Sequence, residues 1–548
     1  MVENTEIHGP STDSVPALDT GAVSKLKRAT GAVFEPWFDR ANVWLDTRME
    51  WLIWLVVFVG FCLRIRLAGE SYLNGDETQI MLPPLQHGLF KVYKAAQHFP
   101  YGPIMNFGLH FMTFFGSSEL YFRMPSVIAG TLLIFVGYKW VAETFNKSAG
   151  LITGLYLAFS PPLITLSAEV RHYITHALFV ACSLYCLERA LRETSSKWMR
   201  YFGIALLLAV LTMYMSIWYI IALGVYATLC FLVEEIPRAV IVEWLKVQAA
   251  VVIVLAVAYV THLRKLRGDA AERLARDGWL RSSYFHPEAQ TVLNYLREAT
   301  GNLFGYIFAN DRLGEWMILV FLIGIGMILL GKAGVRGDRR TPALCLVLPL
   351  AVTAAAGSIG IYPYGGTRHD AFLAVFVVAC DSIAIAALAR EKTVVLSLMA
   401  VCLIPVWLVT AQPNYLDEPP QVCKISQMRS ALDYLSSREP HPQVLLADEI
   451  GGNTMNYYIC HGAVSQWQHI GAGLNTYLCA GYRILTVELW GAPPAAFPAA
   501  LEQARRAMPG QFPDPAWVFY ISPVRTNDEE ISGDRRAVFG KIEIYRIP

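Results

Sequence analysis

The sequence predicts a polytopic α-helical membrane protein that carries a small exported α/β domain. Of its 548 residues, 55% are hydrophobic and only 16% are charged, whereas a soluble domain is about one-quarter charged. Apolar runs long enough to cross a hydrocarbon core of roughly 30 Å recur between Trp51 and Ala411. A net charge of +1, without a basic patch interleaved with aromatic residues, gives no reason to expect a nucleic-acid partner.

Residues 1–50 form the predicted cytoplasmic N-terminal segment. Its first part, residues 1–30, is polar and rich in small side chains, so we expect it to be disordered. The stretch "FEPWFDRANVWLDTRMEWL" then mixes aromatic with charged side chains, which indicates an amphipathic helix lying at the membrane interface. Because the first apolar run begins only at Trp51, we interpret it as a retained anchor rather than a cleaved signal peptide.

About eleven spans are predicted in the transmembrane domain, residues 51–411. One apolar segment exceeds the length of a single crossing, and we divide it near Met215. With a cytoplasmic N-terminus, this division puts the basic connections around Arg192, Arg339 and Lys392 on the inner side, as the positive-inside rule requires. The predicted spans are 51–69, 124–141, 149–166, 173–190, 200–214, 216–233, 246–262, 314–331, 342–359, 370–388 and 393–411.

Two long connections, residues 70–123 and 263–313, then fall on the outer side together with the C-terminal region, residues 412–548. This region alternates helix-like with strand-like segments, which predicts an extracytoplasmic α/β domain. We expect "DEIGGNTMNYYI" to be the end of a strand, a glycine turn and the start of a helix. The other predicted helices are 428–438 and 498–508, and the predicted strands are 443–449, 482–490, 516–522 and 540–547.

Three of the ten cysteines, Cys423, Cys460 and Cys479, lie in the C-terminal region. Three thiols can form at most one disulfide within the chain, and their spacing does not resemble a zinc site. The remaining cysteines lie in apolar runs, where cysteine packs as a small apolar side chain.

Charged and polar side chains gather on the outer face, at the ends of predicted spans. Asp76 and Glu77 directly follow the first span, "SAEVRHY" follows the third, and "YPYGGTRHD" leads into the tenth. Each charged group at the centre of the membrane would cost about 2.5–3.5 kcal/mol, so their convergence indicates a binding site. Carboxylates can remove a proton from an acceptor hydroxyl, and arginines can hold a phosphate in a bidentate manner. The pattern therefore predicts a site for a phosphate-bearing lipid.

Each of these residues also has a plainer interpretation. An acidic pair after a span is often a solvated loop, and Arg64 with the neighbouring Arg66 can extend toward lipid headgroups. His172 and His176 have the spacing of a metal pair on one helix face, but two histidines without a third ligand more often serve packing.

Three stretches resemble polyprenyl-phosphate-dependent glycosyltransferases of the GT-C superfamily, in the branch of protein O-mannosyltransferases and aminoarabinose transferases. They are "YGPIMNFGLHFMTFFGSSELYFRMPSVIAG", "SAEVRHYITHALFVACSLYCLERAL" and "YGGTRHDAFLAVFVV". Asp76 and Glu77 stand where this family carries its catalytic acidic motif. The resemblance implies a helical domain with an outward-facing cavity, which interfacial helices of the first outer loop help to cover. It also implies a polyprenyl-phosphate-linked sugar as donor and transfer with inversion.

The same resemblance implies roles for individual residues. Asp76 is the expected general base with Glu77 beside it, and the donor phosphate is expected to bind to Arg171, Arg368, His369 and Arg64. The residues expected to line the cavity are Glu169, His172, Tyr362 and Tyr364. The pattern does not require a cofactor. Whether the site binds a divalent metal ion is left open, and the candidate ligands are Asp76, Glu77 and Glu169.

The sequence does not decide whether the acceptor is a lipid, a glycan or a protein. The 263–313 connection is too short for the β-trefoil insert of eukaryotic protein mannosyltransferases, which weakens the case for a protein acceptor. Two other functions compete with the enzyme. A transporter or flippase of the same polyprenyl carrier should place polar or broken segments within several spans, whereas the predicted spans are almost wholly apolar. A scaffold would not need the grouped arginines and carboxylates. The sequence therefore favours a multi-pass enzyme of the cell membrane that contacts membrane lipids.

Overall fold

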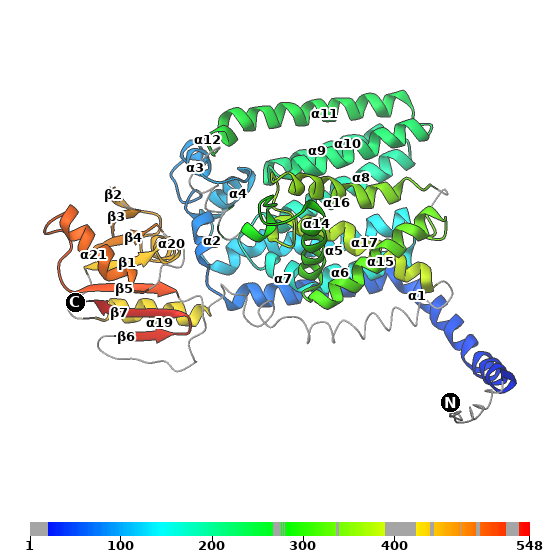
Figure 1. Ribbon diagram of the computed structural model, residues 1–548, viewed down its shortest axis with the longest axis horizontal. Helices are drawn as coiled ribbons and strands as arrows, with labels where there is room; N and C mark the ends of the chain where they lie inside the picture. Colours follow the sequence, from blue (N-terminus) through cyan, green and yellow to red (C-terminus); the bar gives the residue numbers. More distant parts are fainter. Residues whose placement is uncertain are drawn as a thin grey trace, which may run out of the picture.

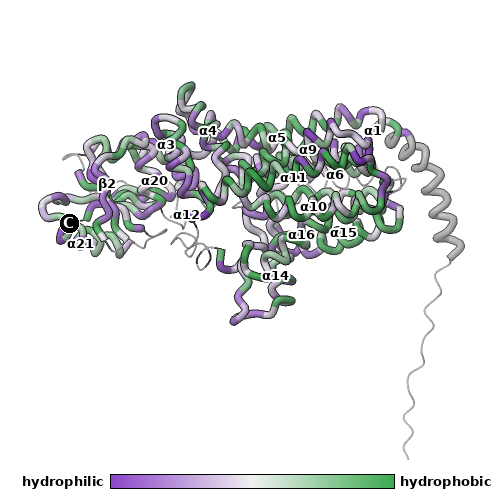
Figure 2. The backbone as a smooth tube through the Cα atoms, turned by 90° about the horizontal axis from the view of Figure 1, so that it is seen from above, coloured by the Kyte–Doolittle hydropathy of each residue, from purple (hydrophilic) through white to green (hydrophobic). Residues whose placement is uncertain are grey.

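The structure is a computed structural model, and it describes residues 20–266, 276, 278, 280–335, 339–389, 424–438, 443–471, 473–488, 494–521 and 536–547. A bundle of roughly parallel and antiparallel helices forms one part, and an α/β domain lies at one end of it (Figure 1). We call this end of the bundle the domain end. Figure 2 shows hydrophobic residues concentrated in the bundle, and more hydrophilic ones in the α/β domain.

Every predicted span that falls within the described residues is helical. The last predicted span, 393–411, lies outside them. Seven helices are long and apolar enough to cross a membrane, and α6 with α7 makes an eighth if this pair, bent by 61°, is one broken span. The bundle helices are α1 (Thr20–Glu70), α5 (Glu119–Thr144), α6 (Lys147–Phe159), α7 (Pro161–Ser167), α8 (Tyr173–Arg192), α9 (Ser196–Thr212), α10 (Ser216–Val233), α11 (Arg238–Ala258), α15 (Asp311–Leu329), α16 (Pro342–Ser358) and α17 (Ala374–Ala389).

The outer surface of the bundle is apolar, as contact with lipid tails requires. Trp51, Ile253 and Leu322 are each more than half exposed, whereas the side chains of α17 are almost all buried at the centre of the bundle. Since water would penalise such a surface, the fold is that of a multi-pass membrane protein.

Three inter-helix connections meet with helix α8 at the end of the bundle opposite the α/β domain, and the prediction also puts these connections on one side (Figure 1). Arg339 donates to Glu234 at 2.8 Å and to Glu188 at 3.3 Å, and Asn146 donates to the carbonyl oxygen of Ala333 at 3.2 Å. The predicted division near Met215 is confirmed, because α9 ends at Thr212 and α10 begins at Ser216.

The predicted interfacial helix is not a separate element. Its residues belong to α1, which runs without a break from Thr20 through the first span to Glu70. The expectation that residues 20–30 are disordered is therefore wrong, and α1 begins ten residues before that predicted boundary. Good helix-forming residues such as Leu, Lys and Arg recur between the polar positions, so helical propensity continues across the junction.

Short helices fill the two long connections at the domain end. The first connection holds α2 (Gly75–Met81), α3 (Leu89–Ala96) and α4 (Ile104–Met112). The second follows the π-helical turn η1 (Tyr259–Leu263) and contains α12 (Arg264–Leu266), the 3₁₀ turn η2 (Arg281–Ser283) and α14 (Val292–Phe308). A further 3₁₀ turn, η4 (Arg368–Leu373), leads into α17.

The α/β domain is built on one seven-stranded sheet in the order β2-β3-β4-β1-β5-β7-β6. Strand β1 pairs in parallel with β4 and β5, and the outer pairs are antiparallel. The strands are β1 (Val444–Asp448), β2 (Ser465–Gly471), β3 (Leu474–Cys479), β4 (Tyr482–Val487), β5 (Ala516–Ile521), β6 (Arg536–Phe539) and β7 (Ile542–Ile547).

Alternating side chains of the strands bury both faces of this sheet. Leu445 packs with α19 (Ile425–Ser436) and α20 (Glu449–Tyr458) on one face, whereas Leu446 packs with α21 (Ala496–Ala507) on the other. This follows from the two-residue period of a strand. All four predicted strands and both predicted helices are present.

In the α/β domain, one predicted turn is wrong and one disulfide pairing is now defined. The expected glycine turn is wrong, because Gly451 and Gly452 lie inside α20, whose N-terminus is capped by Asp448 through a 2.8 Å bond from the Gly451 amide. Cys460 and Cys479 form a disulfide, and Cys423 lies outside the described residues.

Candidate active site

Helix α2 presents the acidic pair at the domain end. Asn74 caps the helix, accepting a bond from the Glu77 amide at 2.9 Å, while Glu77 Oε2 accepts from the Asn74 amide at 3.0 Å. This reciprocal capping box fixes the start of α2 just after α1. Asp76 and Glu77 thus lie in the first turn, where the helix dipole favours negative charge.

The Asp76 carboxylate is the point at which three distant segments meet. Its Oδ2 atom accepts hydrogen bonds from Arg171, which precedes α8, and from Arg368 Nη1 in η4 at 2.7 Å. Asp76 is only 3% exposed and the Arg368 side chain 29% exposed. The other carboxylate oxygen, Oδ1, accepts no hydrogen bond from the described residues. The predicted convergence of Asp76, Arg171 and Arg368 is therefore present.

Tyr173 lies between the two arginines, and the sequence interpretation did not include it. Its ring centre is 5.8 Å from the guanidinium carbon of Arg171 and 5.7 Å from that of Arg368. Its hydroxyl oxygen is 3.4 Å from Nε2 of His369. Such cation–π contacts orient the arginines without neutralising them. The signal available in the sequence was an aromatic residue two positions after an outer-face arginine.

Glu77 has a different environment from Asp76. Arg123 donates to both of its carboxylate oxygens, at 2.8 and 2.6 Å, and the Val170 amide donates at 2.7 Å. Arg123 also donates to the carbonyl oxygens of Ala68, Ser71 and Tyr72 at the end of α1. Both side chains are almost completely buried. Glu77 therefore holds α1, α2 and α5 together, and its carboxylate has no oxygen free of protein contacts.

Glu169 lies at the same site and titrates near neutrality. Burial, reinforced by the negative charge of Glu77, raises its pKa to about 7, although Arg368 and Arg123 act in the opposite direction. Its carboxylate is 3.9 Å from Arg171 Nε. Burial, with repulsion from Arg368, lowers the pKa of Arg171 to about 9, so this arginine stays protonated at neutral pH.

The remaining predicted site residues support the arginines. His172 is buried and stacks on Tyr101 with ring centres 4.8 Å apart, and burial lowers its pKa. Tyr362 is fully buried and donates to the His369 carbonyl oxygen at 3.1 Å. Tyr364 is also buried, with its hydroxyl 3.0 Å from Thr300 Oγ1. The two tyrosines, predicted to line a cavity, instead brace the loop that carries Arg368.

Arg64, a predicted phosphate ligand, lies elsewhere. It is fully buried in the bundle and donates to Ser167 Oγ at 3.1 Å. It also donates to the carbonyl oxygens of Gly60, Ala158 and Leu157 at 2.9 to 3.0 Å. Two of these carbonyl groups, those of Leu157 and Ala158, belong to the last turn of α6. Carbonyl groups of a last turn lack hydrogen-bond partners within their own helix, and α6 ends here because the chain bends at Pro161. Arg64 therefore stabilises the α6–α7 bend.

The candidate metal ligands Asp76, Glu77 and Glu169 each lie near an arginine in this structure. Glu77 is saturated by Arg123 and backbone amides, and Asp76 Oδ2 by two arginines. Across the described ranges, no three His, Cys, Asp or Glu side chains are grouped as metal ligands. In this arrangement Glu77 has no carboxylate oxygen left for a divalent ion.

The α/β domain packs directly against the helix that carries Asp76. A Cβ atom on Gly75 would lie 2.3 Å from Ile450 of α20, so only glycine permits this approach. The Tyr458 hydroxyl accepts from the Leu73 amide at 2.9 Å and donates to Glu119 at 3.2 Å. The domain therefore forms one support of α2, which sequence patterns did not indicate.

A family model and several solved structures are similar to parts or most of this chain. Residues 103–262 match the family model described as dolichyl-phosphate-mannose-protein mannosyltransferase. This range includes Glu169 and Arg171 but neither Asp76 nor Arg368. No curated protein matches the chain by sequence.

ArnT from Cupriavidus metallidurans has a similar fold over almost its whole length. Its structure bound to undecaprenyl phosphate aligns with a TM-score of 0.52 at 13% identity, covering 91% of this chain and 98% of ArnT. The apo structure gives 0.53 at the same identity and coverage. The Archaeoglobus fulgidus oligosaccharyltransferase tethered to an acceptor peptide aligns with a TM-score of 0.45 at 13% identity, covering 76% of this chain and 63% of that one. The chain therefore shares the fold of ArnT over 91% of its length, and part of its helical bundle, residues 103–262, matches the mannosyltransferase family model.

Proposed function

We propose that this protein is an inverting glycosyltransferase that moves a sugar from a polyprenyl-phosphate donor to an acceptor hydroxyl on the outer face of the membrane. The observation that carries the proposal is the Asp76 carboxylate oxygen shared by Arg171 and Arg368. A candidate base, Asp76, is thus hydrogen-bonded directly to two candidate phosphate-binding cations, Arg171 and Arg368. The undecaprenyl phosphate bound in the ArnT structure supports the same class of lipid here.

The charge of this group suits a lipid phosphodiester. Two arginines against one aspartate leave a net positive charge, which Glu169 cancels only when it is ionised. A sugar-linked phosphate has a single negative charge, and the departing polyprenyl phosphate acquires further negative charge as its bond to the sugar breaks. The arginines therefore stabilise the transition state more than the bound donor, which is the requirement for catalysis.

The reaction can be written with Asp76 as the general base. Its Oδ1 accepts the proton of the acceptor hydroxyl while the acceptor oxygen bonds to the anomeric carbon of the sugar. The bond from that carbon to the phosphate oxygen breaks, and its electron pair stays on the phosphate, next to Arg171 and Arg368. Glu77 is bound to Arg123 and supports α2 rather than taking part in proton transfer.

Transfer from a panel of labelled polyprenyl-phosphate sugars tests the proposal. The native protein in lipid nanodiscs is compared with Arg368→Gln and with Arg66→Gln, whose exposed side chain pairs with Glu70 at the end of α1. We expect transfer from one donor, a large loss in Arg368→Gln, and no loss in Arg66→Gln. Absence of transfer from every donor, with the lipid phosphate still bound, would contradict the proposal and favour a carrier-handling protein.

A further inference from the structure

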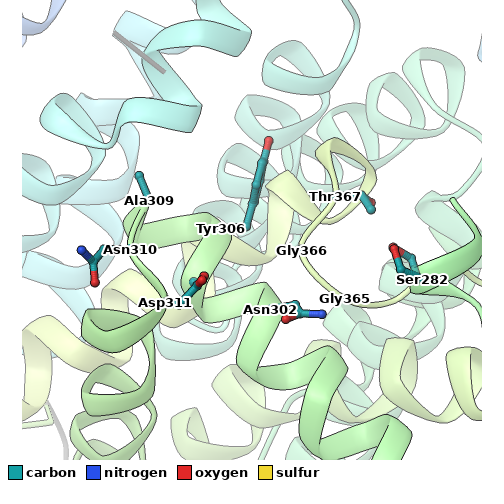
Figure 3. A pocket seen from close by; sticks show the side chains of 11 residues that line it. Ser282, Asn302, Tyr306, Ala309, Asn310, Asp311, Gly365, Gly366 and Thr367 are labelled. Carbon is teal, nitrogen blue, oxygen red and sulfur yellow. The ribbon is translucent and has the colours of Figure 1, made fainter. Parts of the chain in front are cut away.

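A polar cavity of about 290 Å³ is lined by Thr367, the residue just before Arg368 (Figure 3). The reaction proposed above gives this cavity no role. Helix α14, the start of α15, the η2 turn and the 365–367 loop line it, and it is open to the surface. The polar side chains that line it include Ser282, Asn302, Asn310, Asp311 and Thr367.

The loop that forms one wall is pressed onto α14. Gly366 has a φ of +80° and Gly365 one of +133°, and a Cβ atom on Gly366 would lie 2.3 Å from the Asn302 carbonyl oxygen. Only glycine allows both the backbone conformation and this approach. Asp370 Oδ2 accepts from the Gly365 amide at 3.1 Å and so closes the loop on itself. The cavity wall and Arg368 are therefore parts of one braced segment.

The lining chemistry excludes a phosphate and suits a hydroxylated ring. None of the 11 described residues that line the cavity is basic, whereas phosphate sites are built from arginine, lysine or converging amides. Asn302 can donate and accept, and Asp311 is a strong acceptor at the first turn of α15. Both residues are exposed, so their polar groups remain accessible. Sugars present such alternating donors and acceptors.

The size of the cavity limits the ligand to one small unit. Sites for small molecules usually have about 300–1,000 Å³, so a cavity of about 290 Å³ is at the lower end of this range. It has room for a single sugar ring rather than an oligosaccharide.

We propose that this cavity binds the sugar ring of the lipid-linked donor, and that Asn302 and Asp311 determine which sugar is accepted. The inference rests on the proposed function, because it takes Arg368 as the ligand of the adjoining phosphate. In a polyprenyl-phosphate sugar the ring is joined directly to the phosphate. Thr367 in the cavity wall is the chain neighbour of Arg368, so the proposal places the ring and its phosphate at adjoining residues.

The test is donor binding by Asn302→Leu, with Asn294→Leu as the matched control. Both asparagines are exposed on α14, but only Asn302 lines the cavity. We expect Asn302→Leu to weaken binding of the preferred labelled donor about tenfold, since one polar contact is lost and the cavity is partly filled. Binding of bare undecaprenyl phosphate should be unchanged, and Asn294→Leu should behave as the native protein.

Asp311→Asn should change the order of preference among donors that differ only in their sugar. The inference is overturned if Asn302→Leu weakens binding of the bare lipid phosphate as much as binding of the sugar donor. It is also overturned if this variant changes only the KM for the acceptor. An unchanged donor preference in both variants would overturn it as well.

These readouts separate the inference from the proposed function. If the native protein transfers no sugar, the proposed function fails, while the cavity is still tested by binding alone. The cavity proposal then requires that the sugar-linked lipid binds more tightly than the bare lipid phosphate, and that Asn302→Leu removes this difference. Equal binding of the two lipids would overturn it.

Discussion

The hydroxyl of Tyr458, in the α/β domain, accepts a hydrogen bond of 2.9 Å from the backbone amide of Leu73, just before the helix that carries Asp76. The same hydroxyl donates to Glu119 at the start of α5. One side chain of the domain thus joins α5 to the segment between α1 and α2. This contact makes the domain part of the support of the candidate active site.

Tyr458→Phe is therefore expected to lower kcat about fivefold, with a smaller effect on donor KM. A hydrogen bond contributes about 1 kcal/mol, and its loss lets α2 shift while the arginines stay in place. Steady-state transfer kinetics give the two constants. Tyr477→Phe is the control, since its hydroxyl bonds only within the domain, to the Gly452 carbonyl oxygen. Equal effects in the two variants would mean that the contact with Leu73 has no role in the site.

Glu77→Gln should destabilise the protein by about 3–5 kcal/mol, because it leaves the buried Arg123 without its partner. Thermal unfolding of the detergent-solubilised protein measures this loss. Glu70→Gln is the control, since the exposed pair with Arg66 contributes at most about 1 kcal/mol. A Glu77→Gln protein with native stability but no transfer would instead identify Glu77 as a catalytic group.

Donor binding should weaken as the pH rises through about 7. The pKa of Glu169 is raised to about 7 by burial, so its carboxyl is mostly neutral below that pH and charged above it. The added negative charge offsets an arginine and repels the donor phosphate. Binding of a labelled polyprenyl-phosphate sugar between pH 6 and 8 measures the effect, because its phosphodiester does not titrate in this range. Glu169→Gln should bind equally across this range, and a native pH dependence that persists in this variant would assign it to another group.

The helices were predictable because their signals are local. The ten predicted spans that fall within the described residues are helical, although only seven or eight of the described helices are long and apolar enough to cross a membrane. The basic loops separated α9 from α10 at Met215. The gathering of Asp76, Arg171 and Arg368 followed from the same topology, since all three adjoin outer ends of predicted spans. Hydrophobic alternation likewise identified β1, β4, β5 and β7.

Pairings between distant side chains were not predictable in this way. Arg64 and Arg123 are both buried arginines near outer helix ends, yet one caps the α6–α7 bend and the other binds Glu77. Nothing local distinguishes these roles, because each partner comes from a different helix. Strands β2, β3 and β6 were not predicted. The sequence "SQWQHIG" of β2 is largely exposed and lacks alternation, and β6 has only four residues.

The most direct test of the account is transfer by Asp76→Asn, with Asp433→Asn on the exposed surface of α19 as the control. General base catalysis contributes about 10²- to 10⁴-fold, so we expect a loss of this size in Asp76→Asn and none in the control. Undecaprenyl phosphate should bind to Asp76→Asn at least as tightly as to the native protein, because both arginines lose a competing anion. Undiminished transfer by Asp76→Asn would contradict the account.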